Sequence, residues 1–530
     1  MATAAPKLDS VKLGLFVSRM ESVCEEMGAV LQRAAFSPNI KDRLDFSCAI
    51  FDAAGHLCAQ AAHIPVHLGS MAYAMADIVD ACEWRPGDMV VVNDPFLGGT
   101  HLPDVTVIAP CFDAAGVLQA FIANRAHHAD IGASAPGSMP LSKTLTEEGV
   151  VIPPTVLVRA GILDKGLLDE WFGDGQHGDF IAQVSANRTG LQRLKELITL
   201  LPVDFDVAVS QLQDYAEGIA RRRLVELPIG SFAFTDYMDD DGFGHQQLPI
   251  AVKITLGAAG VDVDFSGSAW QVEGNINCPL SVAAAAVYYV FRCLMPDEVP
   301  VCAGLFRPIR LTAPEGCLLN AQRPAAVAAG NVETSMRITD AVLGALAQAA
   351  PELIPAASQG TMNNVAMGGR GAGADWDYYE TIAGGMGAHA NGAGLSAVQS
   401  HMTNTLNTPV ESLEMHYPLR VRSYKIRRNS GGVGQHVGGD GLIREFEFLA
   451  PTQFTLLTER RRLAPWGLAG GGAGAVGKNR LNDQSLPGKI SMTAVAGDVL
   501  KIETPGGGGW GGSSDVGSLM SGDPVNGGLE

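Results

Sequence analysis

Histidine and aspartate residues follow two apolar runs between residues 93 and 132. In NDPFLGGTHLPDVTVIAPCF, His101 and Asp104 lie three residues apart in a glycine-rich turn. In FIANRAHHADIG, His127 and His128 end a second apolar run, and Asp130 follows them. Imidazole and carboxylate groups that converge from two strand ends are a common way to build a site for a divalent metal.

A third apolar run, FSCAIFD, follows Asp45. We expect Asp45, His101, Asp104 and His127 to form one site, because two neutral imidazoles with one or two carboxylates suit Zn²⁺, Mn²⁺ or Fe²⁺ and leave positions open for water or substrate. Such a metal polarises a carbonyl or lowers the pKa of a bound water. The pattern alone also fits hydrogen-bonded loop residues, since an HxxD pair and an HH pair are weak signals.

Other histidine, glycine and arginine motifs favour structural roles. His63 and His67 in HIPVHLG are four residues apart, but Pro65 and Gly69 favour a loop in which they pack or position a substrate. GGVGQHVGGDG, AGGGAGAVG and TPGGGGWG do not match GxxxxGK[ST], so turns and close backbone packing explain them better than a phosphate site. The basic run at 459–462 fits a carboxylate or phosphate site, a subunit contact or a solvated loop.

The spacing of apolar residues predicts the elements that hold the candidate ligands. Residues 11–35 predict a long amphipathic helix. FSCAIFD and HLCAQ, joined by a turn at residues 52–55, predict a β-hairpin, and a DAAG turn predicts a second hairpin within residues 105–128. RPGDMVVVND predicts a turn and an apolar strand, and residues 63–82 predict a loop that leads into a helix. The hairpins would place the four candidate ligands at strand edges or in loops, where catalytic groups usually lie.

The remaining pattern indicates an α+β protein, a large mixed α/β chain with an antiparallel, β-rich C-terminal region. Residues 165–226 predict helices, as do SVAAAAVYYVFRCLM and ETSMRITDAVLGALAQAAP, the second ended by Pro351. β-rich sequence follows residue 230 and fills 441–503, whereas residues 136–160 and 360–440 predict loops. A boundary is expected near 227–232, and a disordered tail is expected over 512–530.

Composition excludes several classes of protein. The 530 residues are 47% hydrophobic and 18% charged, which is enough apolar side chain for a large core. A net charge of -19 disfavours nucleic acid and membrane surfaces as partners. The nine cysteines form no CxxC pair and the N-terminus shows no secretory signal, so we expect reduced thiols in a cytoplasmic protein. The longest apolar run is too short to span a bilayer.

Several longer motifs, taken in order, resemble the hydantoinase B/5-oxoprolinase family over about residues 10–512. The motifs are NDPFLGGTHLPDVTVIAP, RAHHADIG, PGSMP, EGVVIPPT, HMTNTLNTPVESLEMHYPLRV, YKIRRNSGGVGQHVGGDGLIREFEF, TLLTERR and TPGGGGWG. The resemblance implies that residues 1–511 form a B-type catalytic region. It also implies that Asp45, His101, Asp104 and His127 hold a divalent metal (Zn, Mn or Fe), and that His101, Asp104 and His127 are catalytic. His128 replaces His127 if the register slips by one.

The resemblance further implies a divided enzyme. A hydantoinase A-type partner binds ATP with Mg and phosphorylates the substrate carbonyl or its enol oxygen, so a hetero-oligomer is expected. The B-type chain would then open a small cyclic amide such as hydantoin, N-methylhydantoin, 5-oxoproline or a lactam, as an ATP-dependent hydrolase of cyclic C–N bonds. The absence of a convincing ATP motif in this chain fits that division.

Two alternatives stay open. The same metal could serve an ATP-dependent ketone carboxylase of the acetone or acetophenone type, or the chain could be a scaffold for the A-type partner. The family's usual DIGG is replaced here by Asp130-Ile131-Gly132-Ala133, a mild change. Because the carboxylase branch departs further from HHADIG, the resemblance favours the hydrolytic branch.

Overall fold

A seven-stranded antiparallel sheet forms the N-terminal part of the protein, which we describe from a computed structural model covering residues 7–61, 63–173, 177–370 and 375–512. The strand order is β2-β1-β5-β4-β3-β6-β7. The strands are β1 (Phe46–Asp52), β2 (Leu57–Gln60), β3 (Met89–Val92), β4 (Asp104–Phe112), β5 (Leu118–His127), β6 (Thr155–Arg159) and β7 (Ile162–Leu163). The β1–β2 and β4–β5 pairs confirm the two predicted hairpins.

Helices cover this sheet because its central strands are apolar on both faces. The residues of β1 from Phe46 to Phe51 are all buried, as are nearly all of β4 and β5. The long helices α1 (Ser10–Ala34) and α5 (Gly178–Leu200) pack on each other and against β1, β4 and β5. The side chain of Asp9 caps α1 by accepting from the Lys12 N–H. The flanking helices are α2 (Pro38–Lys41), α4 (Lys165–Phe172) and α6 (Phe205–Leu224).

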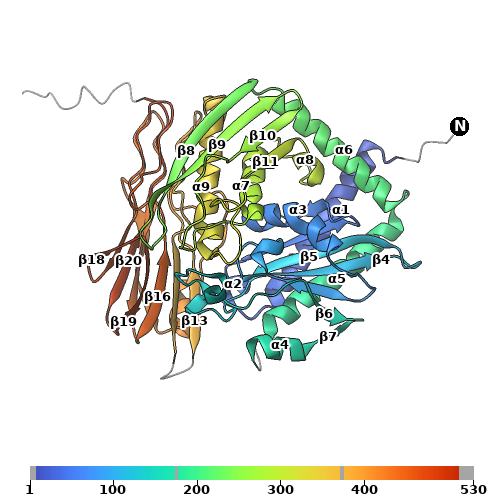
Figure 1. Ribbon diagram of the computed structural model, residues 1–530, viewed down its shortest axis with the longest axis horizontal. Helices are drawn as coiled ribbons and strands as arrows, with labels where there is room; N and C mark the ends of the chain where they lie inside the picture. Colours follow the sequence, from blue (N-terminus) through green and yellow to red (C-terminus); the bar gives the residue numbers. More distant parts are fainter. Residues whose placement is uncertain (1–6, 62, 174–176, 371–374, 513–530) are drawn as a thin grey trace, which may run out of the picture.

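Three buried helices lie between the N-terminal sheet and the C-terminal sheets (Figure 1). Helix α3 (Pro65–Asp80) packs against α7 (Leu280–Cys293), and α7 packs against α9 (Ser335–Leu346). Helix α9 also covers β8 (Gly230–Asp240) and β9 (Gln246–Gly257) of a four-stranded sheet, completed by β10 (Gly260–Asp264) and β11 (Ile309–Thr312). The short helix α8 (Ala303–Phe306) contacts α6. None of the described helices is long and apolar enough to cross a membrane.

Two antiparallel sheets form the C-terminal region, at the left of Figure 1. One has the order β13-β12-β16-β19 and the other β14-β15-β20-β17-β18. The predicted β-rich C-terminal region is therefore confirmed. The elements are β12 (Asn364–Gly369), β13 (Trp376–Glu380), α10 (Val410–His416), β14 (Leu419–Arg427), β15 (Gly441–Phe448), β16 (Thr452–Leu457), β17 (Lys478–Leu481), β18 (Gln484–Leu486), β19 (Lys489–Ala494) and β20 (Val499–Glu503).

Four glycine-rich segments, residues 385–395, 430–441, 465–475 and 505–512, pack backbone against backbone; we call them the glycine bundle. A Cβ atom added to Gly438 would lie 2.0 Å from the Gly507 carbonyl oxygen, and one added to Gly508 would lie 2.1 Å from that of Trp466. The Gly507 N–H donates to the Gly439 carbonyl at 2.9 Å. Because side chains would separate these backbones, glycine is required here. The prediction that the glycine runs serve close packing is confirmed.

Several sequence predictions need correction. The loop expected over 136–160 contains β6, and the loops expected over 360–440 contain β12, β13, α10 and β14. The helix expected up to Pro351 starts with five π-helical residues, Gly330–Thr334, and α9 ends at Leu346. The glycines of β12 (NVAMGG) weaken its apolar pattern, whereas β14 (LRVRSYKIR) carries an alternation of apolar and polar residues that predicts a strand. The expected tail lies outside the described residues from 513 onward, and the boundary near 227–232 stays a prediction.

Candidate metal centre

Three adjacent strands of the N-terminal sheet bring the candidate ligands together at one edge. Asp104, the first residue of β4, lies opposite His127, the last residue of β5. Asp45 directly precedes β1, which pairs with β5, and its carbonyl accepts from the His127 N–H at 3.0 Å. His101 lies in the turn before β4. The expectation that hairpin ends deliver these groups is confirmed.

Asp104 is the centre of the cluster. Its Oδ1 lies 3.1 Å from His101 Nε2 and 3.1 Å from His127 Nδ1. One ligand atom each from His101, Asp104 and His127 lies within 4.8 Å of the others, as a shared cation requires. Asp45 is not among the residues whose ligand atoms meet within 4.8 Å, and it adjoins them through a further imidazole, since His67 Nε2 lies 3.8 Å from Asp45 Oδ1 and 3.1 Å from Asp104 Oδ2.

His67 belongs to the cluster, although its sequence context predicts a loop that packs or positions substrate. Helix α3 begins at Pro65, so His67 points inward from its first turn. Proline is favoured at the first helical position, where its missing N–H has no partner to lose. Position 69 of this helix requires glycine, because a Cβ there would lie 2.6 Å from the Cα atom of Ala285 in α7. The two residues that suggest a loop therefore mark a helix start and a tight helix crossing.

His128 points away from the cluster. Its Nε2 lies 2.9 Å from Gln183 Oε1, and its ring lies 4.5 Å from the ring of Phe180. Successive residues at the end of a strand face opposite sides of the sheet, so His127 and His128 cannot both reach the same site. The structure thus places His127, and not His128, beside Asp104.

Neighbouring groups fix the orientation of each candidate ligand. His101 Nδ1 lies 3.3 Å from the Ala328 carbonyl, so this nitrogen carries a proton and Nε2 is the ring atom that faces Asp104. Thr100 Oγ1 donates to Asp104 Oδ2. The ring of Tyr379 stacks on that of His127, with centroids 4.7 Å apart. These partners come from distant parts of the chain, so no local spacing in the sequence identifies them.

The electrostatics of the cluster favour an ionised Asp104 beside a neutral His127. Burial opposes the charge on Asp104, but His101 and His67, together with hydrogen bonds from His101 and His127, hold the pKa of Asp104 well below its usual range. Burial lowers the pKa of His127, against the opposing effect of Asp104. For His101, burial would lower the pKa, but the charge of Asp104 raises it.

Residues of this buried cluster carry polar atoms without partners. His127 Nε2, His67 Nδ1 and Asn331 Oδ1 are buried without a hydrogen-bond partner. A cavity of about 20 Å³, lined by Asp45, His67, His101, His127 and Asn331 among others, has room for one ion or water. Imidazole nitrogens and carboxylate oxygens around such a cavity fit a divalent cation.

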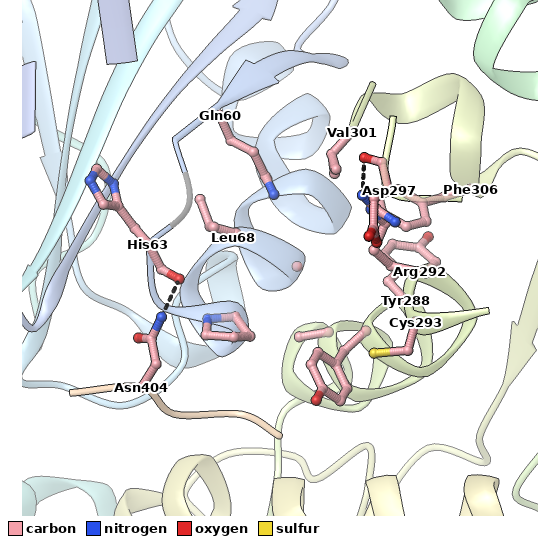
Figure 2. A pocket seen from close by; sticks show the side chains of 14 residues that line it. Gln60, His63, Leu68, Tyr288, Arg292, Cys293, Asp297, Val301, Phe306 and Asn404 are labelled. Atoms are coloured by element: carbon pink, nitrogen blue, oxygen red, sulfur yellow. Dashed lines mark hydrogen bonds between the residues drawn. The ribbon is translucent and has the colours of Figure 1, made fainter. Parts of the chain in front are cut away.

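A larger pocket of about 400 Å³ lies on the other side of the first turn of α3 (Figure 2). Pro65, Leu68 and Gly69 line it from α3, and Tyr288, Arg292 and Cys293 line it from α7. Alternate residues of this turn, Val66 and His67, line the small cavity at the cluster instead. His63 and Asn404 both line the larger pocket, and Asn404 Nδ2 donates to the His63 carbonyl at 3.2 Å. The pocket has the size of a small-molecule site, and residues of the same helical turn line both it and the cavity at the cluster.

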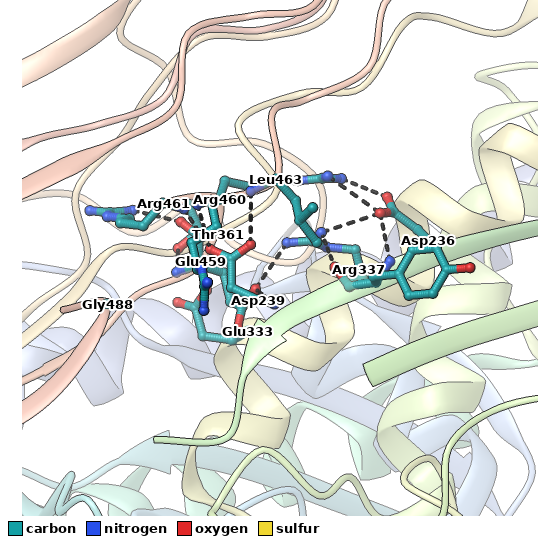
Figure 3. Close-up of polar contacts among 12 residues, drawn as sticks. Asp236, Asp239, Glu333, Arg337, Thr361, Glu459, Arg460, Arg461, Leu463 and Gly488 are labelled. Carbon is teal, nitrogen blue, oxygen red and sulfur yellow. Dashed lines mark hydrogen bonds and ion pairs between the residues drawn. The ribbon is translucent and has the colours of Figure 1, made fainter. Parts of the chain in front are cut away.

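The basic run at 459–462 forms part of a buried ion-pair network (Figure 3). Arg460 lies 2.7 Å from Asp236 of β8 and also pairs with Asp340 of α9. Glu459 lies 3.2 Å from Arg337 of α9 and pairs with Lys489 of β19. Arg460 and Glu459 are fully buried, so the solvated-loop interpretation is wrong for them. The network connects the central and C-terminal sheets.

Comparisons with known proteins agree over nearly the whole chain. The family model described as hydantoinase B/oxoprolinase matches residues 9–513. A 5-oxoprolinase of Dictyostelium discoideum is 39% identical over 96% of this chain, which spans only 41% of that relative. A protein of Pseudomonas sp. strain NS671, provisionally named as the B component of a D-/L-hydantoinase, is 31% identical over 96% of this chain and 91% of its own length.

A solved structure shows the same fold. The ATP-dependent caprolactamase from Pseudomonas jessenii superposes with a TM-score of 0.88 at 26% identity, covering 96% of this chain and 92% of its own. The mixed helices and antiparallel sheets of the present chain confirm the expected α+β class. With a family model matched across nearly every described residue, the chain belongs to the hydantoinase B/oxoprolinase family.

Proposed function

We propose that this chain is the metal-carrying B-type component of an ATP-dependent hydrolase that opens small cyclic amides, such as hydantoins, 5-oxoproline or lactams. The observation that carries the proposal is the buried group of His101, Asp104 and His127, joined by Asp45, at the ends of three adjacent strands. The relatives named for 5-oxoproline, hydantoin and caprolactam support this class of substrate.

The chain's residues would hold a divalent cation and present it to the substrate. A cation bound there would supply Lewis acidity toward a water molecule or an amide carbonyl. Asp104 is kept ionised by its neighbours, and the His101 tautomer that exposes Nε2 is fixed by Ala328. His127 keeps a buried, unpartnered Nε2 beside the same cavity. Asp104, His101 and His127 would therefore present a negative charge and imidazole nitrogens to the small cavity before the substrate binds.

The ring of the substrate would approach through the pocket of Figure 2. Tyr288 and Phe306 stack at 4.2 Å along one side, and Gln60 and Asn404 offer amide groups. Aromatic faces with a few polar groups suit a small ring that carries amide N–H and C=O groups. The first turn of α3 would have to move for the amide carbonyl of the substrate to reach the cluster.

Activation of the amide would come from an ATP-binding A-type partner, with Mg, in a hetero-oligomer. An unactivated cyclic amide is a poor electrophile, so phosphorylation of its oxygen would make the carbon attackable. The glycine runs that superficially resemble phosphate loops are occupied by backbone packing. The name of the Pseudomonas relative, which marks it as one component of a hydantoinase, supports a partner.

Metal analysis of the purified chain tests the cation site. We expect about one equivalent of divalent metal in the wild type and a large loss in His101→Ala, because His101 Nε2 faces the cluster. His128→Ala is the matched control, a neighbouring buried histidine that faces Gln183, and should retain the metal. Metal-free wild-type protein, or equal metal in both variants, would contradict the proposal.

Activity with the co-expressed partner tests the reaction. With ATP, we expect ring opening of hydantoin or 5-oxoproline, and a fall of at least about a hundredfold in Asp104→Asn, with the complex still assembled. Product that requires bicarbonate and a ketone would instead establish the carboxylase alternative. Full activity of Asp104→Asn in an intact complex would establish the scaffold alternative.

A further inference from the structure

We propose that Asn331 supplies its side-chain carbonyl oxygen to the cation and makes the centre one of five protein ligands rather than four. This inference rests on the proposed metal site. It assigns a ligand more than 200 positions away from the other four in the sequence, on an element that no motif marks. It also predicts a preference for cations of high coordination number over tetrahedral Zn²⁺.

The backbone around Asn331 is built to bring this side chain to the cluster. Residues Gly330–Thr334 form a π-helix that continues directly into α9. A π-helical turn is rare, and it is frequently found at functional sites. Gly330 is held by N–H donation to the Asn275 and Val327 carbonyls at 3.0 and 2.9 Å. A Cβ at Gly330 would lie 1.8 Å from the Asn277 carbonyl oxygen, so the turn passes as close as glycine allows.

The amide of Asn331 lies against two proposed ligands at once. Its Nδ2 is 3.0 Å from His101 Nε2 and 3.3 Å from Asp104 Oδ2. The side chain is 3% exposed, and its Oδ1 is buried without a hydrogen-bond partner. An amide at this depth normally has both ends paired. The carbonyl oxygen of this amide therefore has no hydrogen-bond partner among the described residues and is free to serve as a ligand.

Cation binding by His101 and Asp104 determines which end of the Asn331 amide faces the cluster. Because His101 Nδ1 keeps its proton beside the Ala328 carbonyl, Nε2 is the nitrogen that can offer a lone pair to a cation, as the Asp104 carboxylate can. When a cation takes these lone pairs, the NH₂ of Asn331 would face a positive charge without an acceptor. A half-turn about the Cβ–Cγ bond exchanges the nearly isosteric oxygen and nitrogen. It brings Oδ1 to the position that Nδ2 occupies.

The resulting donor set is rich in oxygen. Asp45 and Asp104 contribute carboxylates, Asn331 contributes a carbonyl, and His101 and His127 contribute imidazoles. His67 stays outside the set, because its Nε2 lies beside Asp104 Oδ2 and holds that carboxylate in place. Five such ligands leave one position of an octahedron open, which suits Mn²⁺ or Fe²⁺.

Two substitutions separate the oxygen-ligand role from a role of the NH₂ group. Asn331→Asp keeps an oxygen in place of the carbonyl and removes the NH₂, whereas Asn331→Ala removes both. We expect Asn331→Asp to bind Mn²⁺ at least as tightly as the wild type, and Asn331→Ala to bind it at least about tenfold more weakly. Mn²⁺ titration followed by electron paramagnetic resonance measures both affinities on the purified chain.

Substitution with Co²⁺ reports the coordination number directly. Six-coordinate Co²⁺ absorbs visible light weakly and four-coordinate Co²⁺ absorbs strongly. The wild type and Asn331→Asp should show weak bands, and Asn331→Ala should show a stronger band. Asn187→Ala is the control, since Asn187 is a fully buried asparagine whose partners are Asn124 and the Val107 carbonyl. It should leave both the affinity and the band unchanged.

The outcomes distinguish this inference from the proposed function. If the wild type binds no Mn²⁺ or Co²⁺, the metal site itself is refuted. If the wild type binds metal but Asn331→Ala binds it equally well with the same spectrum, only the role of Asn331 is refuted. Weak binding by Asn331→Asp would also refute it, because the NH₂ would then be the essential group. Should Asn331→Ala fail to fold by circular dichroism, the Asn331→Asp affinity and band decide alone.

Discussion

Asp104 lies within 3.1 Å of nitrogen atoms from three histidines, which come from an α-helix, a turn and a β-strand. It is fully buried, so its negative charge depends on these neighbours. The pKa of Asp104 is therefore held low by contacts that would also align it as a ligand. At the residue scale, the site therefore combines the negative charge of the Asp104 carboxylate with three imidazole rings that surround it.

His63 provides a test of burial at the residue scale. Burial, with a further contribution from His67, lowers the pKa of His63 to about 4, and its Nδ1 accepts from the Cys48 N–H at 3.1 Å. Its pKa in the unfolded chain is about 6.5. Between these values the unfolded chain binds more protons, so the stability from neutral His63 is full above pH 6.5 and is lost as the pH falls toward 4.

We expect this single group to remove about 2 kcal/mol of stability between pH 7 and pH 5. Urea unfolding of EDTA-treated wild-type protein and His63→Gln at both pH values measures the difference. The variant should lose about 2 kcal/mol less than the wild type over this interval, because glutamine does not titrate. Equal losses in the two proteins would show that His63 is not the titrating group.

Local spacing predicted the residues that share strand ends, and it missed those that arrive from elsewhere. His101, Asp104 and His127 come from one hairpin, so their proximity follows from strand pairing alone. Asn331 lies 204 positions beyond His127 and reaches the cluster only because α9 is buried beside it. His67 was visible as a histidine but was placed in the wrong element. Tertiary packing determines the positions of both Asn331 and His67, and a single sequence does not reveal that packing.

At the element scale, the crossing of α3 and α7 holds His67 in place. The helices touch at Gly69, where a Cβ would lie 2.6 Å from Ala285 Cα and 2.7 Å from Ala285 Cβ. Gly69→Ala should therefore destabilise the protein by about 1–3 kcal/mol through overpacking. It should also weaken metal binding, because displacement of α3 moves His67 away from Asp104.

Gly14 offers a matched control for this substitution. It lies in α1 with nothing within 4 Å of an added Cβ. Gly14→Ala should stabilise the protein by about 0.5–1 kcal/mol, because alanine favours helix. Thermal unfolding and Mn²⁺ affinity of the two variants make the comparison. A Gly69→Ala protein as stable as the wild type would show that the crossing can relax.

The hairpins were predictable as elements because alternating apolar residues flank clear turn signals. Their bounds at β1 (Phe46–Asp52) and β4 (Asp104–Phe112) agree closely with the pattern. Strand β12 (Asn364–Gly369) was not predicted because its asparagine and glycines weaken the alternation, and β13 (Trp376–Glu380) is only five residues long. Those strands exist because β16 pairs with β12, a partner almost 90 residues away.

On the scale of the whole molecule, the ion-pair network of Figure 3 connects β8, α9, β19 and the segment after β16. Burial opposes the charge on Asp236, but Arg460 and Arg337 hold its pKa below the usual value. Removing Arg460 would leave Asp236 and Asp340 buried without that guanidinium. The network thus makes the central and C-terminal sheets depend on each other.

Arg460→Ala should destabilise the protein by about 3–5 kcal/mol, the usual cost of leaving a buried charge without its partner. Arg310→Ala serves as the control, because Arg310 forms an exposed pair with Asp262 at 2.7 Å and should cost less than about 1 kcal/mol. Guanidinium unfolding followed by fluorescence and circular dichroism measures both. Similar small losses would mean that the network contributes little to the folded state.

The glycine bundle has a consequence for protein synthesis. Its last segment, residues 505–512, lies against the three segments that precede it in the chain, and the Trp510 N–H donates to the His436 carbonyl at 2.9 Å. A nascent chain on the ribosome cannot close this bundle until Trp510 has left the exit tunnel. The hairpins that carry Asp45, His101, Asp104 and His127 emerge hundreds of residues earlier. During translation, the first strands can thus pair before residues 505–512, the last segment of the glycine bundle, have been synthesised.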